Sequence, residues 1–299
     1  MRRKIKSRSI YRYNYVVKNI NADQVDLEEY LSQYLEYDQD GNELLEINYT
    51  PDGVIQDKTE KKYDEQGRMI EQKYYDGEDL LAEHLTFERD NEGKIHREFL
   101  HYLDGSKDTT FFNYNTEGQL ISKITKDEED QEESREEYTY QHENRIKYEK
   151  HEEGELKKKE ESRFDEKGNL VESIVTDHEQ QDYYSLKHEY DGDKRIRTFR
   201  YHQDGKLIEK LEFRYDDGNI KLVQQETPAG KVIQQFEHDE KGNTLKQEEF
   251  NSDNQLNNSI ERNYDEEGNP LETKVYINLH GQGIDRNYIL KYKYEFYDE

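Results

Sequence analysis

The octet YDEQGRMI at residues 63–70 returns, with substitutions, along almost the whole chain. Consecutive copies lie 23 to 26 residues apart. Spacing of this regularity is typical of a repeat protein, in which each unit packs mainly against its neighbours. The ten copies begin at Tyr37, Tyr63, Arg89, Tyr114, Tyr140, Phe164, Tyr190, Tyr215, His238 and Tyr264.

The octet has the composition of a tight turn. Its glycine adopts a positive φ at no steric cost, and its acid can accept backbone N–H groups as an Asx turn. The aromatic residue ends one strand, and the apolar pair begins the next. In the copy YQHENRI at 140–146, Asn144 takes the place of the glycine. Because asparagine tolerates positive φ better than most residues, we predict the left-handed turn position at Asn144.

A second, looser turn follows about half a period later in each repeat. It reads TPDG at 50–53, LDG at 103–105 and TPAG at 227–230, and Gly41 and Gly53 are twelve residues apart. Twelve residues accommodate one strand and its turn, so the spacing predicts antiparallel strands joined by hairpins.

The segments between the turns alternate as strands do. In GKLIEKLEFRYD (205–216), Leu207, Leu211 and Phe213 fall on one face. Other segments are apolar only at their ends, which is too little for two packed sheets. We therefore predict an all-β fold, a repetitive antiparallel β-hairpin meander of roughly twenty strands with a period of about 25 residues. Strand twist would make it a single-layer twisted or spiralling sheet.

The sequence predicts two regions, an N-terminal cap at 1–36 and one continuous repeat domain at 37–299. In the cap, Tyr11, Tyr13 and Tyr15 alternate as a strand, and NINAD at 19–23 reads as a turn. The segment after that turn fits a helix or a strand, and we favour a strand because the other octets follow strands. This cap would cover one sheet edge.

The other end of the chain carries the most apolar stripe, which includes Tyr288, Tyr292 and Tyr294. It follows the loop NLHGQGIDRN and precedes Tyr297, which begins a further, incomplete copy of the octet. The stripe predicts either a closing strand or a docking edge.

Composition limits the classes of partner and compartment. The formal net charge is −27, which disfavours binding to nucleic-acid phosphates and suits basic proteins or cations. The chain has no cysteine, which excludes disulfides. No apolar run is long enough to span a membrane, and no secretory signal follows the basic start. We expect a cytoplasmic location by default, with the cell surface or periplasm as alternatives if a leader is missing.

The octets resemble the YD repeats of Rhs and related bacterial proteins, whose core is a YDxxGR-like unit followed by an apolar pair. The resemblance rests on YDEQGRMI, YDQDGNEL at 37–44 and FDEKGNLV at 164–171, and it covers residues 37–299. It implies β-hairpin arrays that wind into spirals or shells. Large members enclose toxin domains, and others are cell-surface proteins with proposed carbohydrate or protein contacts. The DPxG-type motif and a toxin domain after Tyr297 are missing from this sequence, so it resembles a free-standing array.

Motifs for catalysis are absent from the sequence. It contains no HExxH, no GxSxG and no GxxxxGK[ST], so we expect no enzyme, no catalytic or metal-binding residue and no cofactor. Calcium is the weaker interpretation of the acidic turns at Asp38 and Asp40, or at Asp191 and Asp193, and Asx turns are the stronger one.

The function predicted from the sequence is a non-catalytic binding or scaffold protein. Its extended acidic, tyrosine-rich sheet would engage a protein partner in a larger bacterial assembly. The alternatives are a carbohydrate-binding surface module and a shell-like or chaperone role toward a toxin or secreted protein. The candidate contact residues, where aromatic side chains cluster most densely, are Tyr11, Tyr13, Tyr15, Tyr288, Tyr292 and Tyr294.

Overall fold

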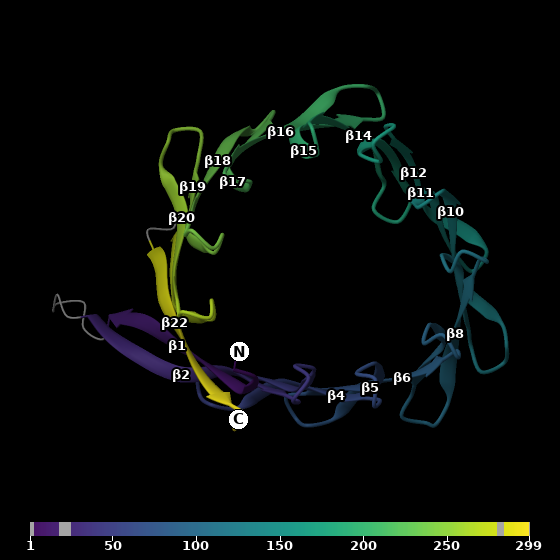
Figure 1. Cartoon of the computed structure of the whole chain (residues 1–299), viewed down its shortest axis with the longest axis horizontal. Helices are drawn as coiled ribbons and strands as arrows, with labels where there is room; N and C mark the ends of the chain where they lie inside the picture. Colours follow the sequence, from purple (N-terminus) through teal and green to yellow (C-terminus); the bar gives the residue numbers. More distant parts are fainter. Residues whose placement is uncertain (1–2, 18–24, 280–283, 299) are drawn as a thin grey trace. The chain divides into compact units, whose positions relative to one another are not determined.

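The computed structural model describes residues 3–17, 25–279 and 284–298. In these ranges the chain forms 22 strands of one sheet, and the pairings within it are antiparallel (Figure 1), so the predicted all-β hairpin meander is confirmed. The strands are β1 (Ile5–Val17), β2 (Val25–Tyr37), β3 (Glu43–Tyr49), β4 (Ile55–Tyr63), β5 (Met69–Asp76), β6 (Leu81–Arg89), β7 (Ile95–His101), β8 (Lys107–Tyr114), β9 (Leu120–Lys126), β10 (Glu132–Gln141), β11 (Asn144–Glu152), β12 (Glu155–Phe164), β13 (Leu170–Asp177), β14 (Asp182–Asp191), β15 (Lys194–His202), β16 (Leu207–Asp216), β17 (Asn219–Thr227), β18 (Gly230–His238), β19 (Thr244–Phe250), β20 (Leu256–Tyr264), β21 (Pro270–Leu279) and β22 (Ile284–Phe296).

The strands belong to two compact units. Unit 1 comprises Met1–His84, Tyr215–Leu222 and Val232–Glu299, and unit 2 comprises Leu85–Arg214 and Val223–Lys231. Unit 1 therefore contains both ends of the described chain.

The first and last strands pair with each other in unit 1. Strand β1 is hydrogen-bonded to β2 on one side and to β22 on the other, so that Tyr13 lies between Glu29 and Ile289. Beyond β22, the backbone N–H of Tyr297 donates to the carbonyl of Lys4 at 3.0 Å. Figure 1 shows β1, β2 and β22 side by side, with the two termini close together. We call the pairing of β1 with β22 the seam.

The seam corrects the predicted form of the sheet. An open, spiralling sheet is wrong, because the sheet closes where β1 meets β22. Of the two roles predicted for the C-terminal stripe, the closing strand is therefore confirmed. The segment at 25–37 is a strand, as favoured from the sequence. The predicted turn NINAD and the centre of the loop NLHGQGIDRN lie outside the described residues.

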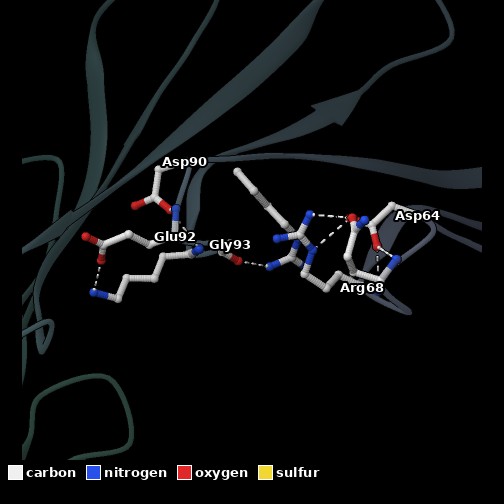
Figure 2. Close-up of polar contacts among 8 residues, drawn as sticks. Asp64, Arg68, Asp90, Glu92 and Gly93 are labelled. Atoms are coloured by element: carbon white, nitrogen blue, oxygen red, sulfur yellow. Dashed lines mark hydrogen bonds and ion pairs between the residues drawn. The ribbon is translucent and has the colours of Figure 1, made fainter.

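In seven of the ten octets the acid, or an asparagine in its place, ties the turn as predicted. Asp64 Oδ1 accepts hydrogen bonds from the backbone N–H groups of Gln66 and Arg68, both at 2.9 Å, and Gly67 has a φ of 74°. Figure 2 shows this turn with its labelled Asp64–Arg68 pair, and it shows the same use of Asp90 in a separate copy. The same side-chain role is filled at Asp38, Asp90, Asn115, Asp165, Asp239 and Asp265, and in second turns at Asp76, Asp127 and Asn251.

One degenerate octet differs from its prediction. In the copy at 140–146 the positive φ, 56°, belongs to His142, and Asn144 already lies in β11. Gln141 pairs with Asn144, so two residues suffice for this turn, whereas the turn after Tyr63 is longer. A two-residue hairpin places its left-handed residues directly after the first paired position. The residue that must adopt a positive φ is therefore His142.

The aromatic residue of the octet connects successive repeats. The Tyr63 hydroxyl donates to the carbonyl of Glu43, about one repeat earlier, at 3.0 Å. The incomplete last copy makes the bond that closes the sheet, because the Tyr297 hydroxyl donates to the carbonyl of Tyr37 at 2.7 Å. Equivalent bonds are made by the hydroxyls of Tyr114 to Ile95, Tyr190 to Leu170 and Tyr264 to Thr244.

Hydrophobic burial is sparse in a sheet of this kind. Leu35, Val175 and Val275 are the buried hydrophobic residues of the described chain, and small or polar residues such as Ser173 and Thr273 are buried beside them. These side chains bury against their neighbours on the same face of the sheet. The hydrogen-bonded turns and tyrosine ties therefore carry a larger share of stability than in a protein with a two-layer core.

We predict that Asp38→Ala lowers the free energy of unfolding by about 1 kcal/mol, because it leaves turn N–H groups without their acceptor. Asp38→Asn should have little effect, since Asn115 and Asn251 fill the same role in other copies. Urea unfolding followed by circular dichroism measures both variants. Equal losses for the two substitutions would contradict the role given to the side-chain oxygen.

The pH dependence of this turn follows from the same contacts. Partial burial alone would raise the pKa of Asp38, but hydrogen bonds from the Asn42 side chain and the turn N–H groups outweigh it and lower the pKa. Because the pKa is lowered, the stabilisation from the Asp38 carboxylate is present at pH values above the ordinary pKa of aspartate. It is lost as the pH falls through the lowered pKa of the folded protein. The cost of Asp38→Ala should therefore shrink in acid.

Candidate functional site at the seam

The seam brings together the two tyrosine clusters predicted from opposite ends of the sequence. Asn14 of β1 lies directly opposite Tyr288 of β22, and Tyr11 lies opposite Lys291. Residues directly opposite each other on antiparallel strands share a face, and successive residues alternate between faces. The cluster at residues 11–15 therefore lies on one face of the sheet, and the cluster at 288–294 lies on the other.

The C-terminal tyrosines hold the seam together. The Arg12 guanidinium lies over the Tyr288 ring, 3.8 Å from its centre. The Tyr292 hydroxyl is 3.2 Å from the hydroxyl of Thr273, and the Tyr294 hydroxyl donates to a backbone carbonyl at the start of β21 at 2.8 Å. Burial is the main cause that raises the pKa of Tyr294 to about 12. These three rings are engaged within the sheet.

On the other face, lysines of β22 cover two of the N-terminal tyrosines. Lys293 Nζ lies 4.1 Å from the centre of the Tyr11 ring, and Lys291 Nζ lies 4.8 Å from that of Tyr13. Burial, followed by the hydrogen bond with Glu29, raises the pKa of Tyr13. Both rings are half-buried, and each has a lysine ammonium over it.

Tyr15 is the most accessible of the six predicted residues. Its relative exposure is 48%, and Leu27, directly opposite on β2, is 52% exposed. Ile289, opposite Tyr13, continues the apolar strip on this face. We call the whole group the seam surface; it consists of Tyr11, Tyr13, Tyr15, Leu27, Glu29, Leu31, Ile289, Lys291 and Lys293.

The seam surface is also unusual in its charge. The stretch from Arg3 to Tyr15 carries five cationic side chains and no acid, although the whole chain has a net charge of −27. Arg8 and Arg12 of this stretch lie on the opposite face, and on the seam surface itself the two lysines of β22 stand beside the tyrosines and one acid, Glu29. Leu27, Ile289 and the lysines were not among the predicted residues, and their signal in the sequence was the alternation of β2 and β22.

Unit 2 contains a polar groove between two octet turns. It has a volume of about 910 Å³ and runs between the turn at 141–144 and the turn at 165–168. In four other octets the turn glycine lies close to the preceding repeat, as Gly67 does to the Asn42 side chain, 3.5 Å from the position of a Cβ atom. Gly168 has no such neighbour within 4 Å, so these turns stand apart. Phe164, Ile146, Gln141, Asn144 and Ser162 are among the lining residues.

Unit 1 also contains a charged cluster on β4, β5 and β6. Glu71 pairs with the ammonium groups of Lys62 and Lys73, and its Oε1 lies 2.9 Å from His84 Nε2. These contacts, led by the hydrogen bond from Lys62, lower the pKa of Glu71 to about 2. The cluster is an ion-pair network across three strands.

We predict that Glu71→Gln lowers the free energy of unfolding at pH 7 by about 1 kcal/mol, a value reduced by solvent screening. Because the pKa is lowered, the stabilisation is complete above about 4.5, the ordinary value, and is lost as the pH falls toward 2. Urea unfolding at several pH values measures the difference. Glu83→Gln, at an exposed position of β6, is the matched control, and a pH-independent difference for Glu71→Gln would contradict the ion-pair explanation.

The acidic turns named for calcium are accounted for in part by their own hydrogen bonds. Asp38 Oδ1 accepts N–H groups of Asp40 and Asn42, and Oδ2 accepts the Asn42 side chain. Asp191 and Asp193 flank Gly192, which has a φ of 62°. The Asx interpretation holds at Asp38, and calcium at these positions stays untested.

Comparisons with known proteins give only distant similarities. No family model matches the chain, and no curated protein matches it. The crystal structures of TcdB2-TccC3-Cdc42 and TcdB2-TccC3 align at TM-scores of 0.41 and 0.40 with 9% and 10% identity. They cover 97% and 93% of this chain, which spans about a fifth (21% and 20%) of theirs. A porin-like protein from Bacteroides uniformis aligns at a TM-score of 0.33 with 10% identity, covering 97% of this chain and 96% of its own.

These TM-scores are too low to assign a shared fold or a function. In the described ranges, the structure contains no helix that is long and apolar enough to cross a membrane. The seam surface and the groove are therefore the two candidate functional sites of the described residues.

Proposed function

We propose that this chain is a non-catalytic binding or scaffold protein that engages a protein partner through the seam surface. The observation that supports it is the exposed Tyr15–Leu27 pair, which continues into tyrosines flanked by Lys291 and Lys293. Tyrosine is enriched at protein interfaces, where its ring supplies contact area and its hydroxyl a hydrogen bond. The closed sheet supplies a rigid support, because each strand of the seam is paired on both sides.

The charge of the seam surface points to the kind of partner. The sequence alone favoured basic partners, because the chain as a whole is acidic. The lysines of the seam surface instead favour an acidic patch on the partner, while the remaining acidic surface repels the same patch elsewhere. The partner would thereby be directed to the seam.

A photo-crosslinking amino acid at position 15 tests this proposal in the native host. We expect an adduct of defined mass from position 15 and none from position 74, where Tyr74 is also exposed in unit 1. Reversing the charges with Lys291→Glu and Lys293→Glu should abolish the adduct. The same adducts from both positions, or none from position 15, would contradict the proposal.

We also infer that the repeat is of the YD type. The inference is supported by the octet, in which the acid ties the turn and the tyrosine hydroxyl reaches back one repeat.

The groove of unit 2 favours carbohydrate binding as a second candidate function. Its lining combines the Phe164 ring with the amides of Gln141 and Asn144 and the hydroxyl of Ser162. A sugar places its apolar face on an aromatic ring and its hydroxyls on such polar groups. An extended peptide is a poorer fit, because β10, β11 and β12 already pair with their neighbours.

A glycan array tests the second candidate. Phe164→Ala should abolish binding of any glycan that the protein retains, and Phe112→Ala, outside the groove in unit 2, should not. Binding that survives Phe164→Ala would place the carbohydrate elsewhere and overturn this assignment.

A further inference from the structure

A group of three potential metal ligands lies on the β10–β11 hairpin of unit 2. Glu137 lies directly opposite Glu149, and His151 follows two residues later on the same face. One ligand atom from each of the three lies within 4.8 Å of the other two. This group lies outside the acidic turns named above for calcium.

The group contains features that the sheet alone does not explain. Like charges directly opposite each other on neighbouring strands destabilise a sheet, so the Glu137–Glu149 pair has a cost. Two cations offset it in part: Lys147 Nζ lies 2.7 Å from Glu149 Oε2, and Nη1 of Arg135, which lies opposite His151, is 3.7 Å from Glu137. The imidazole of His151 makes no hydrogen bond to another described residue, although it is half-buried beside two carboxylates.

We propose that Glu137, Glu149 and His151 bind a divalent transition-metal ion, with zinc as the best match. Two carboxylates and an imidazole are a donor set that such ions accept, and three protein ligands leave a position for water. Bonds of about 2.0–2.1 Å separate donor atoms by about 3.4 Å in a tetrahedral site. The three side chains therefore need to move inward by about 1 Å, which rotation about their terminal bonds provides.

The cations beside the three ligands determine the affinity that we expect for the metal ion. Lys147 Nζ pairs with Glu149 Oε2 at 2.7 Å, which leaves the other oxygen of that carboxylate for the ion. The ammonium competes with the metal for Glu149, so we expect moderate affinity, and replacing Lys147 with Met should strengthen binding. The ion would join the two strands and remove the repulsion between the paired carboxylates.

Titration with cobalt(II) chloride and then zinc chloride tests the site, using the full chain with any purification tag removed. Wild type should bind one cobalt ion with the visible absorption of a four- or five-coordinate site, and zinc should displace it. Losses of supporting groups around a metal cost about 10–100-fold in affinity, so losing a ligand in His151→Ala or Glu149→Gln should cost more than about 100-fold. His142→Ala, in the turn of the same hairpin, is the control and should bind as wild type does.

The other outcomes would overturn the assignment. No binding, or several weak sites that His151→Ala leaves unchanged, would mean an adventitious ion only. A loss in His151→Ala without any loss in Glu137→Gln and Glu149→Gln would exclude the three-ligand site. Circular dichroism and metal-free urea unfolding check that each variant is folded, and His151→Gln replaces His151→Ala if that variant is not.

Discussion

Replacing either Arg12 or Tyr13 with proline is expected to lower the free energy of unfolding by about 2–3 kcal/mol or more. Both residues lie in the middle of β1, which pairs with β2 and with β22. Successive N–H groups of a strand point to opposite sides, so one of the two is directed to β2 and the other to β22. In a closed sheet each proline removes a ladder bond and leaves a carbonyl without its donor.

The pair of substitutions distinguishes a closed sheet from an open one. Proline is tolerated in an edge strand where its missing N–H would face solvent. If β1 were an edge strand, one of the two variants would therefore have a free energy of unfolding within about 0.5 kcal/mol of that of wild type. Arg12→Ala and Tyr13→Ala are the controls for the lost side chains; the loss of the Arg12–Tyr288 contact should cost about 0.5–1 kcal/mol. Urea unfolding followed by circular dichroism measures all four variants.

Leu35→Ala should lower the free energy of unfolding by about 2–3 kcal/mol, near the lower end of the range for buried leucines. Leu35 is 3% exposed and is the most buried hydrophobic residue of the described chain. It lies in β2 between Arg8 of β1 and Glu46 of β3, so its removal leaves a gap beside the seam. A sheet with few buried hydrophobic residues has little else to fill that gap.

The matched control is Leu27→Ala on the same strand. Leu27 is 52% exposed, so its truncation should change the free energy of unfolding by less than about 0.5 kcal/mol. The same measurement compares both variants. Similar losses at the two positions would contradict the burial that the structure gives to Leu35.

The sequence predicted the local structure well, because turn chemistry acts over a few residues. The glycine and acid of YDEQGRMI gave the turn, and the alternation after it gave the strands. The left-handed position predicted at Asn144 was wrong. The length of the turn decides that position, and a difference of one residue separates a two-residue turn from a longer one. The closure could not be predicted, since it pairs strands that lie at opposite ends of the sequence. The apolar stripe with Tyr288, Tyr292 and Tyr294 was its sign in the sequence, since it predicted either a closing strand or a docking edge.

For the candidate sites too, the local features could be predicted from the sequence and the long-range pairing could not. The tyrosines near residues 13 and 292 could be picked out by their density, but only the pairing of β1 with β22 places them at one seam, on opposite faces. The metal-ligand group was closer to being predictable from the sequence. Glu149 and His151 are two residues apart in one strand, and the hairpin turn at 141–144 sets which residue of β10 lies opposite them. That register depends on the turn length, where the prediction failed.

A double-cysteine variant tests the closure of the sheet most directly. The chain has no cysteine, so Ser9→Cys with Lys293→Cys introduces its only two thiols, at positions directly opposite each other across the seam. Directly opposed strand residues lie within reach of a disulfide, whereas diagonal ones are about 7–8 Å apart. Under mild oxidation the closed sheet predicts an intramolecular disulfide in most monomers of this variant, and far less in the diagonal control Ser9→Cys with Lys291→Cys. Free thiols or only intermolecular dimers in the first variant would show that β1 and β22 do not meet.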